Sequence, residues 1–341
     1  MRICVTGATG FIGEYFCEHF AANGHEVVGI DLVKPRADLP LTRFVHGDIR
    51  DEGAMKLALD GCSRVLGLAA AHHDFGIERQ TYFDVNEGAS RLLGDLCDRA
   101  GIREVCWYSS AAIYGDCPKP RNEQGVPAPT HPYGQSKLAG EKVWRAWAAR
   151  GDGRSMLCIR PTITFGPRNW ANMFSLIRQI EQRRFFIAGA GTNFKSLSYV
   201  ENLVSSTLHL WGTPRPGFEV FNWVEKPDLN STQIAHAVAK ALGRSSPGPR
   251  LPYGLVRVAA LPFDAVIAMT GWNLPVSGMR VKKLFKDETL FESSKARAAG
   301  CAPAITTEEG IRRMVEWYLS EGKHSEVRWR QPPAPVQTFA D

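Results

Sequence analysis

The feature of this sequence that most restricts its fold is a regular alternation of short apolar runs with longer amphipathic segments. The apolar runs are RICVTG, EVVGID, RFVHGD, RVLGLAA, EVCWYSS and MLCIRPT, which lie between residues 2 and 162. The segments between them, such as YFDVNEGASRLLGDLCDRAG, place apolar residues three and four positions apart, as an amphipathic helix does. Strands that are apolar on both faces and alternate with helices form parallel sheets buried between two helical layers. The sequence therefore predicts an α/β chain built on a doubly wound parallel sheet.

A glycine-rich turn, ICVTGATGFIGEYF, joins the first predicted strand to the first predicted helix. Gly7, Gly10 and Gly13 let the backbone turn sharply and approach a pyrophosphate, to which the helix N-terminus offers free N–H groups. Asp31 ends the second predicted strand, 18 residues after Gly13. A carboxylate there can accept hydrogen bonds from the adenosine ribose hydroxyls and would repel the extra phosphate of NADP. The pattern predicts a Rossmann-like site for NAD.

A second motif, HPYGQSKLAGEKVW, places Tyr133 and Lys137 four positions apart on one helix face. To act as a base at neutral pH, a tyrosine needs its pKa lowered by about 3 units, or about 4 kcal/mol. The ammonium of Lys137 and the positive nicotinamide ring can supply this. Ser110, at the end of the fifth predicted strand, can hydrogen-bond the same substrate oxygen. A YxxxK pair alone occurs by chance in many helices, but together with the glycine turn and Ser110 it predicts a catalytic group.

These motifs together resemble the extended short-chain dehydrogenase/reductase family, which includes nucleotide-sugar epimerases and dehydratases. The matching pieces are TGATGFIG, GDIRD, LAAAH, DVNEGASRLL, SSAAIYGD, YGQSK, RPTITFGPR, SYVENLV and TTEEGIRRMVEWY, from residue 5 to residue 318. The resemblance implies that Ser110 binds the substrate oxygen, that Tyr133 is the acid/base, and that Lys137 binds the cofactor ribose and lowers the pKa of the tyrosine. It also implies that Asn86 supports the site.

The predicted cofactor contacts extend beyond the glycine turn to the ends of several strands. Asp48, in GDIRD, could contact the adenine or simply close a turn at a strand end. The full set that we expect is Gly7, Thr9, Gly10, Phe11, Ile12, Gly13, Asp31, Asp48, Ile49, Leu68, Ala69, Ala70, Asn86, Tyr133, Lys137 and Pro161.

The two residues after Ser110 reduce the number of reactions that the predicted site could catalyse. In family members that dehydrate, decarboxylate or epimerise at adjacent carbons, additional Asp, Glu or Cys side chains lie there or nearby. Ala111 and Ala112 can neither donate nor accept a proton. We therefore expect hydride chemistry alone: an NAD-dependent epimerase of a nucleotide-linked sugar, acting at C4. The alternative is an NAD(P)-dependent dehydrogenase or reductase of a sugar or a hydrophobic, 3β-hydroxysteroid-like alcohol, and a non-catalytic dinucleotide-binding protein is a minor alternative.

A substrate diphosphate would need cations from the second half of the chain. The basic side chains there could instead form an ordinary solvated surface, and the two adjacent histidines after the fourth strand could be structural. The Arg-x-Gly-Asp-type stretch typical of many sugar epimerases is missing before SSKA. The substrate contacts that we expect are His72, His73, Ser110, Ala111, Asn172, Lys195 and Arg280.

Composition excludes several other classes. The net charge of +6 includes no run dense enough for nucleic acid binding. The eight cysteines are scattered, so we expect buried thiols and no metal site. MRICVTG enters a strand directly, which predicts a cytoplasmic protein without a signal peptide. The apolar segment 251–272 carries Arg257, Pro262 and Asp264, so we expect a packed helix pair and no stable membrane insertion.

After Pro161 the pattern becomes mixed, which predicts a smaller α/β domain for the substrate. We expect residues 1–165 and about 195–225 to form the NAD-binding domain, and 166–194 and 226–330 the substrate-binding domain. Residues 331–341 would be a loose tail. The helices over 82–100 and 133–149 correspond to those that pair in dimers of the family. We therefore expect a homodimer, although their apolar stripes could also serve the core of one subunit.

Overall fold

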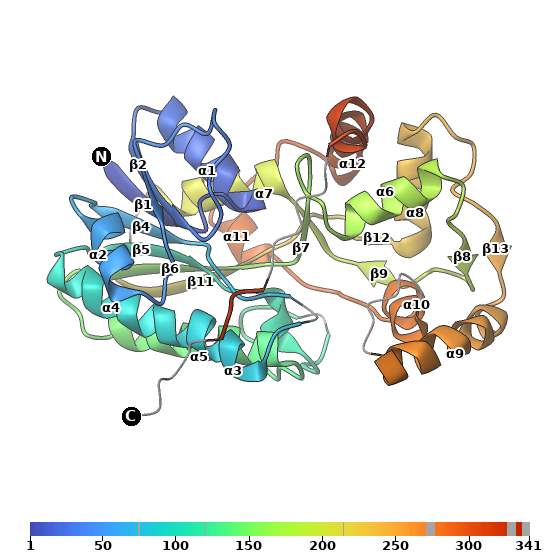
Figure 1. The fold of residues 1–341 in the computed structure, drawn as a ribbon, viewed down its shortest axis with the longest axis horizontal. Helices are drawn as coiled ribbons and strands as arrows, with labels where there is room; N and C mark the ends of the chain where they lie inside the picture. Colours follow the sequence, from blue (N-terminus) through green and yellow to red (C-terminus); the bar gives the residue numbers. More distant parts are fainter. Residues whose placement is uncertain (74–75, 120, 214, 271–276, 326–331, 336–341) are drawn as a thin grey trace.

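The computed structural model describes residues 1–73, 76–119, 121–213, 215–270, 277–325 and 332–335. Its central element is a seven-stranded sheet in the order β11-β6-β5-β4-β1-β2-β3, in which every neighbouring pair is parallel (Figure 1). The doubly wound parallel sheet predicted from the sequence is therefore confirmed. Its strands are β1 (Arg2–Thr6), β2 (Glu26–Asp31), β3 (Arg43–His46), β4 (Arg64–Gly67), β5 (Glu104–Tyr108), β6 (Ser155–Pro161) and β11 (Gly217–Trp223).

Helices cover both faces of this sheet, because the strands are apolar on both sides. One apolar core joins α1, α7 and α11 to the sheet through side chains such as Phe16, Leu203 and Ala296. The core on the other face joins α2, α4 and α5 through Met55 and Trp144, among others. The bounds are α1 (Phe11–Ala22), α2 (Glu52–Leu59), α4 (Ala89–Arg99), α5 (Pro132–Ala148), α7 (Val200–Trp211) and α11 (Ser294–Ala298).

The second region, on the right of Figure 1, packs helices and three short strand pairs around a separate apolar core. Two of its helices begin with side-chain caps. Asn230 and Gln233 form a reciprocal capping box, and the Thr306 side chain accepts a hydrogen bond from the Glu309 N–H. The elements are β7 (Ile163–Phe165), β8 (Ile187–Ala188), β9 (Phe194–Lys195), β10 (Leu197–Tyr199), β12 (Leu229–Asn230), β13 (Arg250–Leu251), α6 (Asn172–Glu181), α8 (Ser231–Ala241), α9 (Tyr253–Thr270), α10 (Gly278–Phe285), α12 (Thr307–Trp317) and a π-helical turn at Tyr318–Gly322.

Two helical predictions need correction. The helix expected over 82–100 contains a π-helical turn, Asp84–Gly88, between α3 (Arg79–Phe83) and α4. The helix pair expected within 251–272 is wrong: residues 253–270 form the single helix α9, which continues through Pro262, and its partner is α10. Residues 271 and 272 lie outside the described part of the chain.

The apolar stripes that suggested a dimer are used within one subunit. Leu93 and Leu96 of α4 and Trp144 and Trp147 of α5 are buried in the core beneath the sheet.

All eight cysteines are buried, as expected. Within the tail, the described residues 332–335 lie against the body, because Pro335 lines a pocket beside α3.

Candidate active site

The turn between β1 and α1 forms a close-packed backbone cradle. Gly7 has φ +71°, and a Cβ added there would lie 2.8 Å from the backbone N of Ala69. A Cβ on Gly13 would lie 2.2 Å from the Gly7 carbonyl oxygen. Gly10 precedes α1 without capping it by a side chain, so the first N–H groups of the helix are available to an anion.

The carboxylate of Asp31 lies at the end of β2, beside this turn. It accepts hydrogen bonds from the backbone N–H groups of Thr9, at 3.1 Å, and Val33, at 3.2 Å. Arg36, five residues after Asp31, forms ion pairs with Glu14, at 3.4 Å, and with Glu18. Its guanidinium is therefore engaged with α1, and the contact of Asp31 with a cofactor ribose stays a prediction.

Asp48 closes a turn after β3. Its carboxylate accepts hydrogen bonds from the Arg50 backbone N–H, at 2.8 Å, and from the Arg50 guanidinium, at 2.6 Å. Burial opposes ionisation, but these hydrogen bonds and the charge of Arg50 hold the pKa of Asp48 below its ordinary value. These contacts agree with the interpretation that Asp48 closes a turn at the strand end. That Asp48 contacts a cofactor stays a prediction. Ile49 packs partly buried between two apolar clusters.

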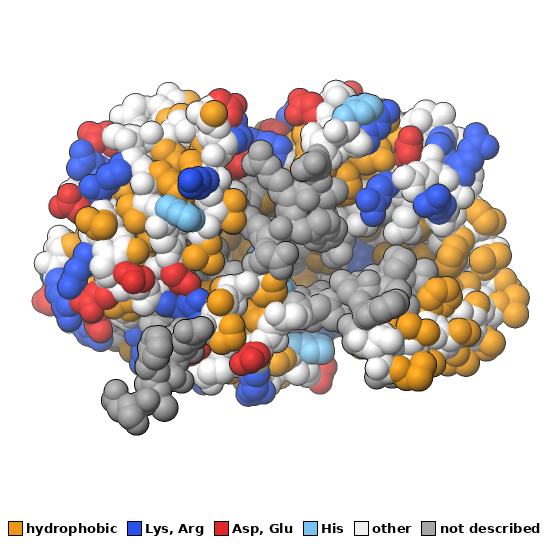
Figure 2. Space-filling model, in the orientation of Figure 1, with side chains coloured by type: hydrophobic (Ala, Val, Ile, Leu, Met, Phe, Trp, Pro, Cys, Tyr) orange, Lys and Arg blue, Asp and Glu red, His pale blue; other side chains and the backbone are white. Residues whose placement is uncertain are grey.

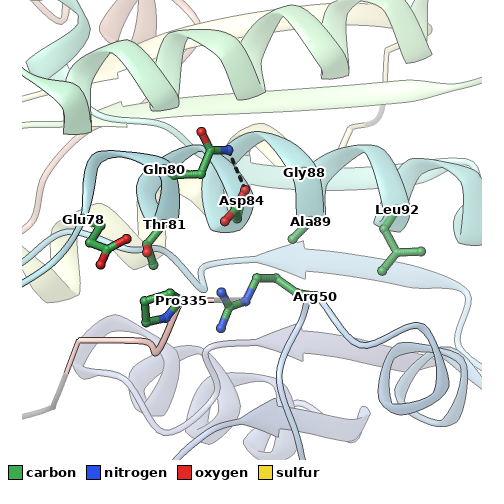
Figure 3. A pocket seen from close by; sticks show the side chains of 9 residues that line it. All are labelled: Arg50, Glu78, Gln80, Thr81, Asp84, Gly88, Ala89, Leu92 and Pro335. Carbon is green, nitrogen blue, oxygen red and sulfur yellow. Dashed lines mark hydrogen bonds between the residues drawn. The ribbon is translucent and has the colours of Figure 1, made fainter. Parts of the chain in front are cut away.

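A pocket of about 630 Å³ lies beside this turn, between Arg50 and the helical segment from α3 to α4 (Figure 3). Figure 3 shows that Arg50 and Pro335 form one wall and that Gln80 donates a hydrogen bond to Asp84 on the other. Ser110, Tyr133 and Lys137 do not line this pocket.

Backbone groups at the end of β4 are held by the neighbouring strand β1. The N–H groups of Leu68 and Ala69 each donate to the Thr6 carbonyl at 3.1 Å. Ala70 follows them, and the exposed ring of His72 stacks on that of His73 at 5.0 Å.

Ser110 follows β5 and begins the 3₁₀ turn Ala111–Tyr114. Its Oγ accepts a hydrogen bond from the Ala112 N–H at 3.1 Å, which sets the direction of the turn. Ala111 is buried and Ala112 is exposed. The two positions that could carry a second acid or base therefore carry methyl groups.

Helix α5 lies directly against this turn. A Cβ on Gly134, the residue after Tyr133, would lie 2.6 Å from the Ala112 carbonyl oxygen. One turn further, Lys137 Nζ donates to the Tyr108 carbonyl at 2.6 Å and lies 4.3 Å from the Trp107 ring centroid. The fold thus brings the end of β5 and the first turns of α5 together, and with them the three predicted catalytic residues.

The buried position of Lys137 changes its acidity. Burial disfavours the charged form and lowers the pKa of Lys137 to about 7, although the nearby Cys158 and Glu141 act in the opposite direction. The buried amine therefore loses its proton more easily than an exposed lysine does.

Asn86, in the π-helical turn, connects α5 to the end of β4. Its side-chain amide donates to Ser136 Oγ at 2.9 Å and to the Ala71 carbonyl at 3.0 Å, and its Oδ1 accepts from the Ala71 N–H. Ser136 in turn donates to the Tyr133 carbonyl at 2.9 Å. Asn86 therefore positions the helix that carries Tyr133 and Lys137.

The remaining predicted residues are more dispersed. Pro161 ends β6, and Asn172 is the exposed first residue of α6, whose N-terminus has no side-chain cap. Lys195 is buried in β9, where its Nζ donates to the Asp287 carbonyl at 2.5 Å. Arg280 belongs to α10, but its side chain lies outside the described residues. Pro161, Asn172 and Lys195 lie on other elements than Ser110, Tyr133 and Lys137.

Two sets of contacts were not predicted from the sequence: those that surround the Lys137 amine, and those that hold the loop before α6. Trp107 and the Tyr108 carbonyl surround Lys137, and they could have been suspected only from their place just before Ser110. Arg168 pairs with Glu18 at 2.9 Å and lies over the Tyr15 ring, which ties this loop to α1. Arg168 lies within the quoted segment RPTITFGPR, which was the available signal.

The comparisons with known proteins agree with this geometry. A profile described as "NAD dependent epimerase/dehydratase family" matches residues 3–222. The chain is 33% identical over 327 residues to the N-acetyl-alpha-D-glucosaminyl-diphospho-ditrans,octacis-undecaprenol 4-epimerase of Escherichia coli O157:H7, covering 96% of this chain and 98% of that protein.

Two solved structures have the same fold. The UDP-glucuronic acid 4-epimerase of Bacillus cereus, solved with NAD, superposes with a TM-score of 0.73 at 22% identity, covering 93% of this chain and 98% of that one. The UDP-glucose 4-epimerase of Thermotoga maritima, solved with UDP-glucose, gives a TM-score of 0.74 at 22% identity, covering 94% and 99%.

Proposed function

Because this chain belongs to the NAD-dependent epimerase/dehydratase family, we propose that it epimerises, at C4, a hexose that a diphosphate joins to its carrier. The observation that carries this proposal is the packing of α5 against the Ser110 turn. This packing supports a catalytic group of Ser110, Tyr133 and Lys137, beside two alanines that cannot take part in proton transfer. A relative that is 33% identical over almost the whole chain is named as a 4-epimerase, which supports the same reaction.

The residues of the β1–α1 turn fit an NAD molecule. A Cβ at Gly7 or Gly13 would clash with neighbouring backbone atoms, so this tight turn needs glycine there, and the uncapped start of α1 offers N–H groups to a pyrophosphate. Asp31 would accept hydrogen bonds from the adenosine ribose. When bound, NAD supplies a nicotinamide ring that can accept a hydride from the substrate and return it.

The protein's own groups would manage the proton and the orientation. Tyr133 would take the proton from the C4 hydroxyl and return it after the sugar has turned over. Ser110 would donate a hydrogen bond to the same oxygen. Lys137 donates a hydrogen bond to the Tyr108 carbonyl. When the Lys137 amine is protonated, its charge would stabilise the phenolate of Tyr133. Ala111 and Ala112 add no second acid or base, so elimination of water is not supported.

The proposal has two forms, which differ in the molecule to which the diphosphate joins the sugar. The sequence predicts a nucleotide, and the names of the solved structures include UDP-sugars. The Escherichia coli relative is named for a sugar carried by a diphospho-undecaprenol, which is a lipid. Both carriers present the same diphosphate, for which we propose Asn172, Lys195 and Arg280 as ligands.

The reaction is tested with a panel of UDP-, GDP-, dTDP- and polyprenyl-diphosphate sugars, with and without added NAD⁺. We expect an isomeric product without net NADH, detected by chromatography and by absorbance at the NADH band. Stoichiometric NADH with an oxidised sugar, or turnover only of a steroid-like alcohol, would instead establish the dehydrogenase that the sequence leaves open.

We further propose that the predicted division into two domains holds and that the protein acts in the cytoplasm as a homodimer. The separate apolar cores of the two regions support the division. The dimer would have to form through the outward, polar sides of α4 and α5, because their apolar stripes face the core.

A further inference from the structure

Helix α9 has an unusual distribution of side chains. At about 100° per residue, one side of the helix packs Val256 and Ala260 inward, where both are buried. The opposite side faces solvent and carries no charged residue, whereas a surface helix ordinarily turns polar residues outward. Leu255, Val258 and Met269 on this side are 67%, 64% and 78% exposed. The outward side, here called the α9 face, consists of Leu255, Val258, Leu261, Pro262, Ala265 and Met269.

The α9 face lies at one end of the molecule. Figure 1 places α9 and α10 at the edge of the second region, away from the seven-stranded sheet, and Figure 2 shows hydrophobic side chains gathered there. Met279 of α10 extends the same surface and is 75% exposed. A contiguous exposed apolar patch on a folded protein marks an interaction site.

The charges around the α9 face are mostly positive. Residues 250–288 contain six Lys and Arg residues and three acidic residues, a net charge of +3, whereas the whole chain carries +6. Asp264 is turned toward α10: it accepts a hydrogen bond from the Gly278 N–H at 2.8 Å and pairs with Arg257 at 3.4 Å. Lys282, which pairs with Asp287 at 3.7 Å, and Lys286 are exposed on and just after α10.

We propose that the α9 face binds an anionic membrane surface, lying in the plane of the interface. An apolar helix face flanked by cations is the pattern of a helix that buries its apolar side among lipid headgroups. A second copy of the chain fits less well, because face-to-face pairing would bring two segments of net charge +3 together. No helix among the described residues is long and apolar enough to cross a bilayer, so the contact is peripheral.

This surface is connected to the predicted substrate residues. Asn193, two residues before Lys195, donates to the Leu284 and Asp287 carbonyls at 2.9 and 2.8 Å. Ser231, the first residue of α8, also donates to the Leu284 carbonyl, so the end of α10 is held against α8 and the residue before β9. Docking through α9 would therefore present this side of the protein to a sugar whose diphosphate carrier is anchored in the bilayer. That last step rests on the proposed function, whereas the membrane contact does not.

The contact is tested by flotation of the full-length, NAD-loaded protein with vesicles. We expect binding to phosphatidylcholine vesicles that contain phosphatidylglycerol, and weaker binding to phosphatidylcholine alone or at high salt. The triple variant Leu255→Glu, Val258→Glu, Met269→Glu should lower the binding constant more than tenfold. Lys282→Gln and Lys286→Gln should each lower it about fivefold. Leu57→Glu, at an exposed leucine of α2, is the matched control and should bind as the wild type does.

Three results would overturn the proposal: no flotation of the wild type, equal flotation of the triple variant, or conversion of a wild-type oligomer to a smaller species by the triple variant. Unchanged melting temperature and unchanged turnover of a water-soluble UDP-sugar would show that the variant is folded. Loss of turnover only for a polyprenyl-diphosphate sugar in vesicles would then link docking to the substrate. If no sugar is epimerised by any variant, the proposed function fails while the flotation result still stands.

Discussion

At the scale of single residues, the site depends on how side chains of ordinary reactivity are surrounded. Lys137 is buried between the Trp107 ring and the Tyr108 carbonyl, so its charge is not shared with water. Tyr133 lies one helical turn before it, and its ring centroid is 6.4 Å from that of Tyr82. Each of these placements gives a different expected response to substitution.

Tyr133→Phe should reduce kcat by 10² to 10⁴-fold, because it removes only the group that exchanges the proton. NAD affinity, measured by calorimetry, should stay close to that of the wild type. Tyr253→Phe, which removes a hydroxyl from α9, is the control and should keep normal turnover of a soluble substrate. Near-native activity of Tyr133→Phe would show that another group is the acid/base.

Lys137→Met should abolish turnover and yet stabilise the unliganded protein below neutral pH. The folded pKa of about 7 lies below the ordinary value of 10.5, so folding must desolvate or deprotonate this amine. The resulting destabilisation is complete below pH 7 and declines as the pH rises toward 10.5. The melting temperature of the variant should therefore exceed that of the wild type most at pH 6, and the difference should shrink by pH 9. A difference that is constant with pH would contradict this assignment.

Asp31 should make the protein bind NAD at least about tenfold more tightly than NADP, since charged hydrogen bonds contribute about 1.5–3 kcal/mol. Asp31→Asn should reduce this preference by weakening the ribose contact and removing the repulsion of a phosphate. Calorimetric titration of both cofactors measures it, and equal or tighter binding of NADP by the wild type would disprove the role of Asp31.

At the scale of elements, α5 is held in position by glycines that permit backbone contact. Besides Gly134 at the Ser110 turn, Gly140 packs against the π-helical turn, where an added Cβ would lie 2.5 Å from the Asn86 carbonyl oxygen and 2.8 Å from Trp107. Asn86 reinforces the contact through Ser136. The position of α5, and with it the catalytic group, therefore depends on the close approach of these backbones.

Gly140→Ala should destabilise the protein by about 1–3 kcal/mol and lower turnover, because neither the Asn86 carbonyl nor the Trp107 ring can move away easily. Gly254→Ala is the matched control: it is also a helical glycine, and an added Cβ would meet nothing within 4 Å. That substitution should be neutral or stabilising by up to about 1 kcal/mol. Thermal unfolding of both variants tests the comparison, and equal effects would refute the packing argument.

At the scale of the whole molecule, α1 links the cofactor side to the second region. Tyr15 donates to the Pro167 carbonyl at 3.1 Å, and Arg168 pairs with Glu18. The loop before α6, whose N-terminus is a predicted diphosphate site, is therefore attached to the helix that begins at the glycine turn. The positions of the two predicted phosphate sites are coupled through α1.

A homodimer is the expected assembly at micromolar concentration, measured by light scattering. Arg91 and Asp95 on α4 and Lys142 and Arg145 on α5 are exposed and would form part of its interface. Charge reversal at Arg91 and Arg145 together should then weaken the dimer. A strictly monomeric wild type would contradict this prediction.

Local patterns in the sequence determined the parallel sheet, the glycine turn, the helix caps and the YxxxK helix, because each depends on residues close together in the chain. The alternation of apolar runs could be interpreted without knowing any partner, since strands buried on both faces have few other uses. The family resemblance carried the same elements as far as residue 318.

Only the tertiary structure decided whether the apolar surface of each helix is buried in the core or exposed to solvent. The stripes of α4 and α5 could have served a dimer or a core, and they are buried in the core because β4 to β6 lie against them. Residues 253–270 could have formed a packed pair, but Pro262 lies within a single helix whose outer side no described element covers. Periodicity shows that a helix has an apolar side, whereas which side meets a partner is decided by contacts between residues far apart in the sequence.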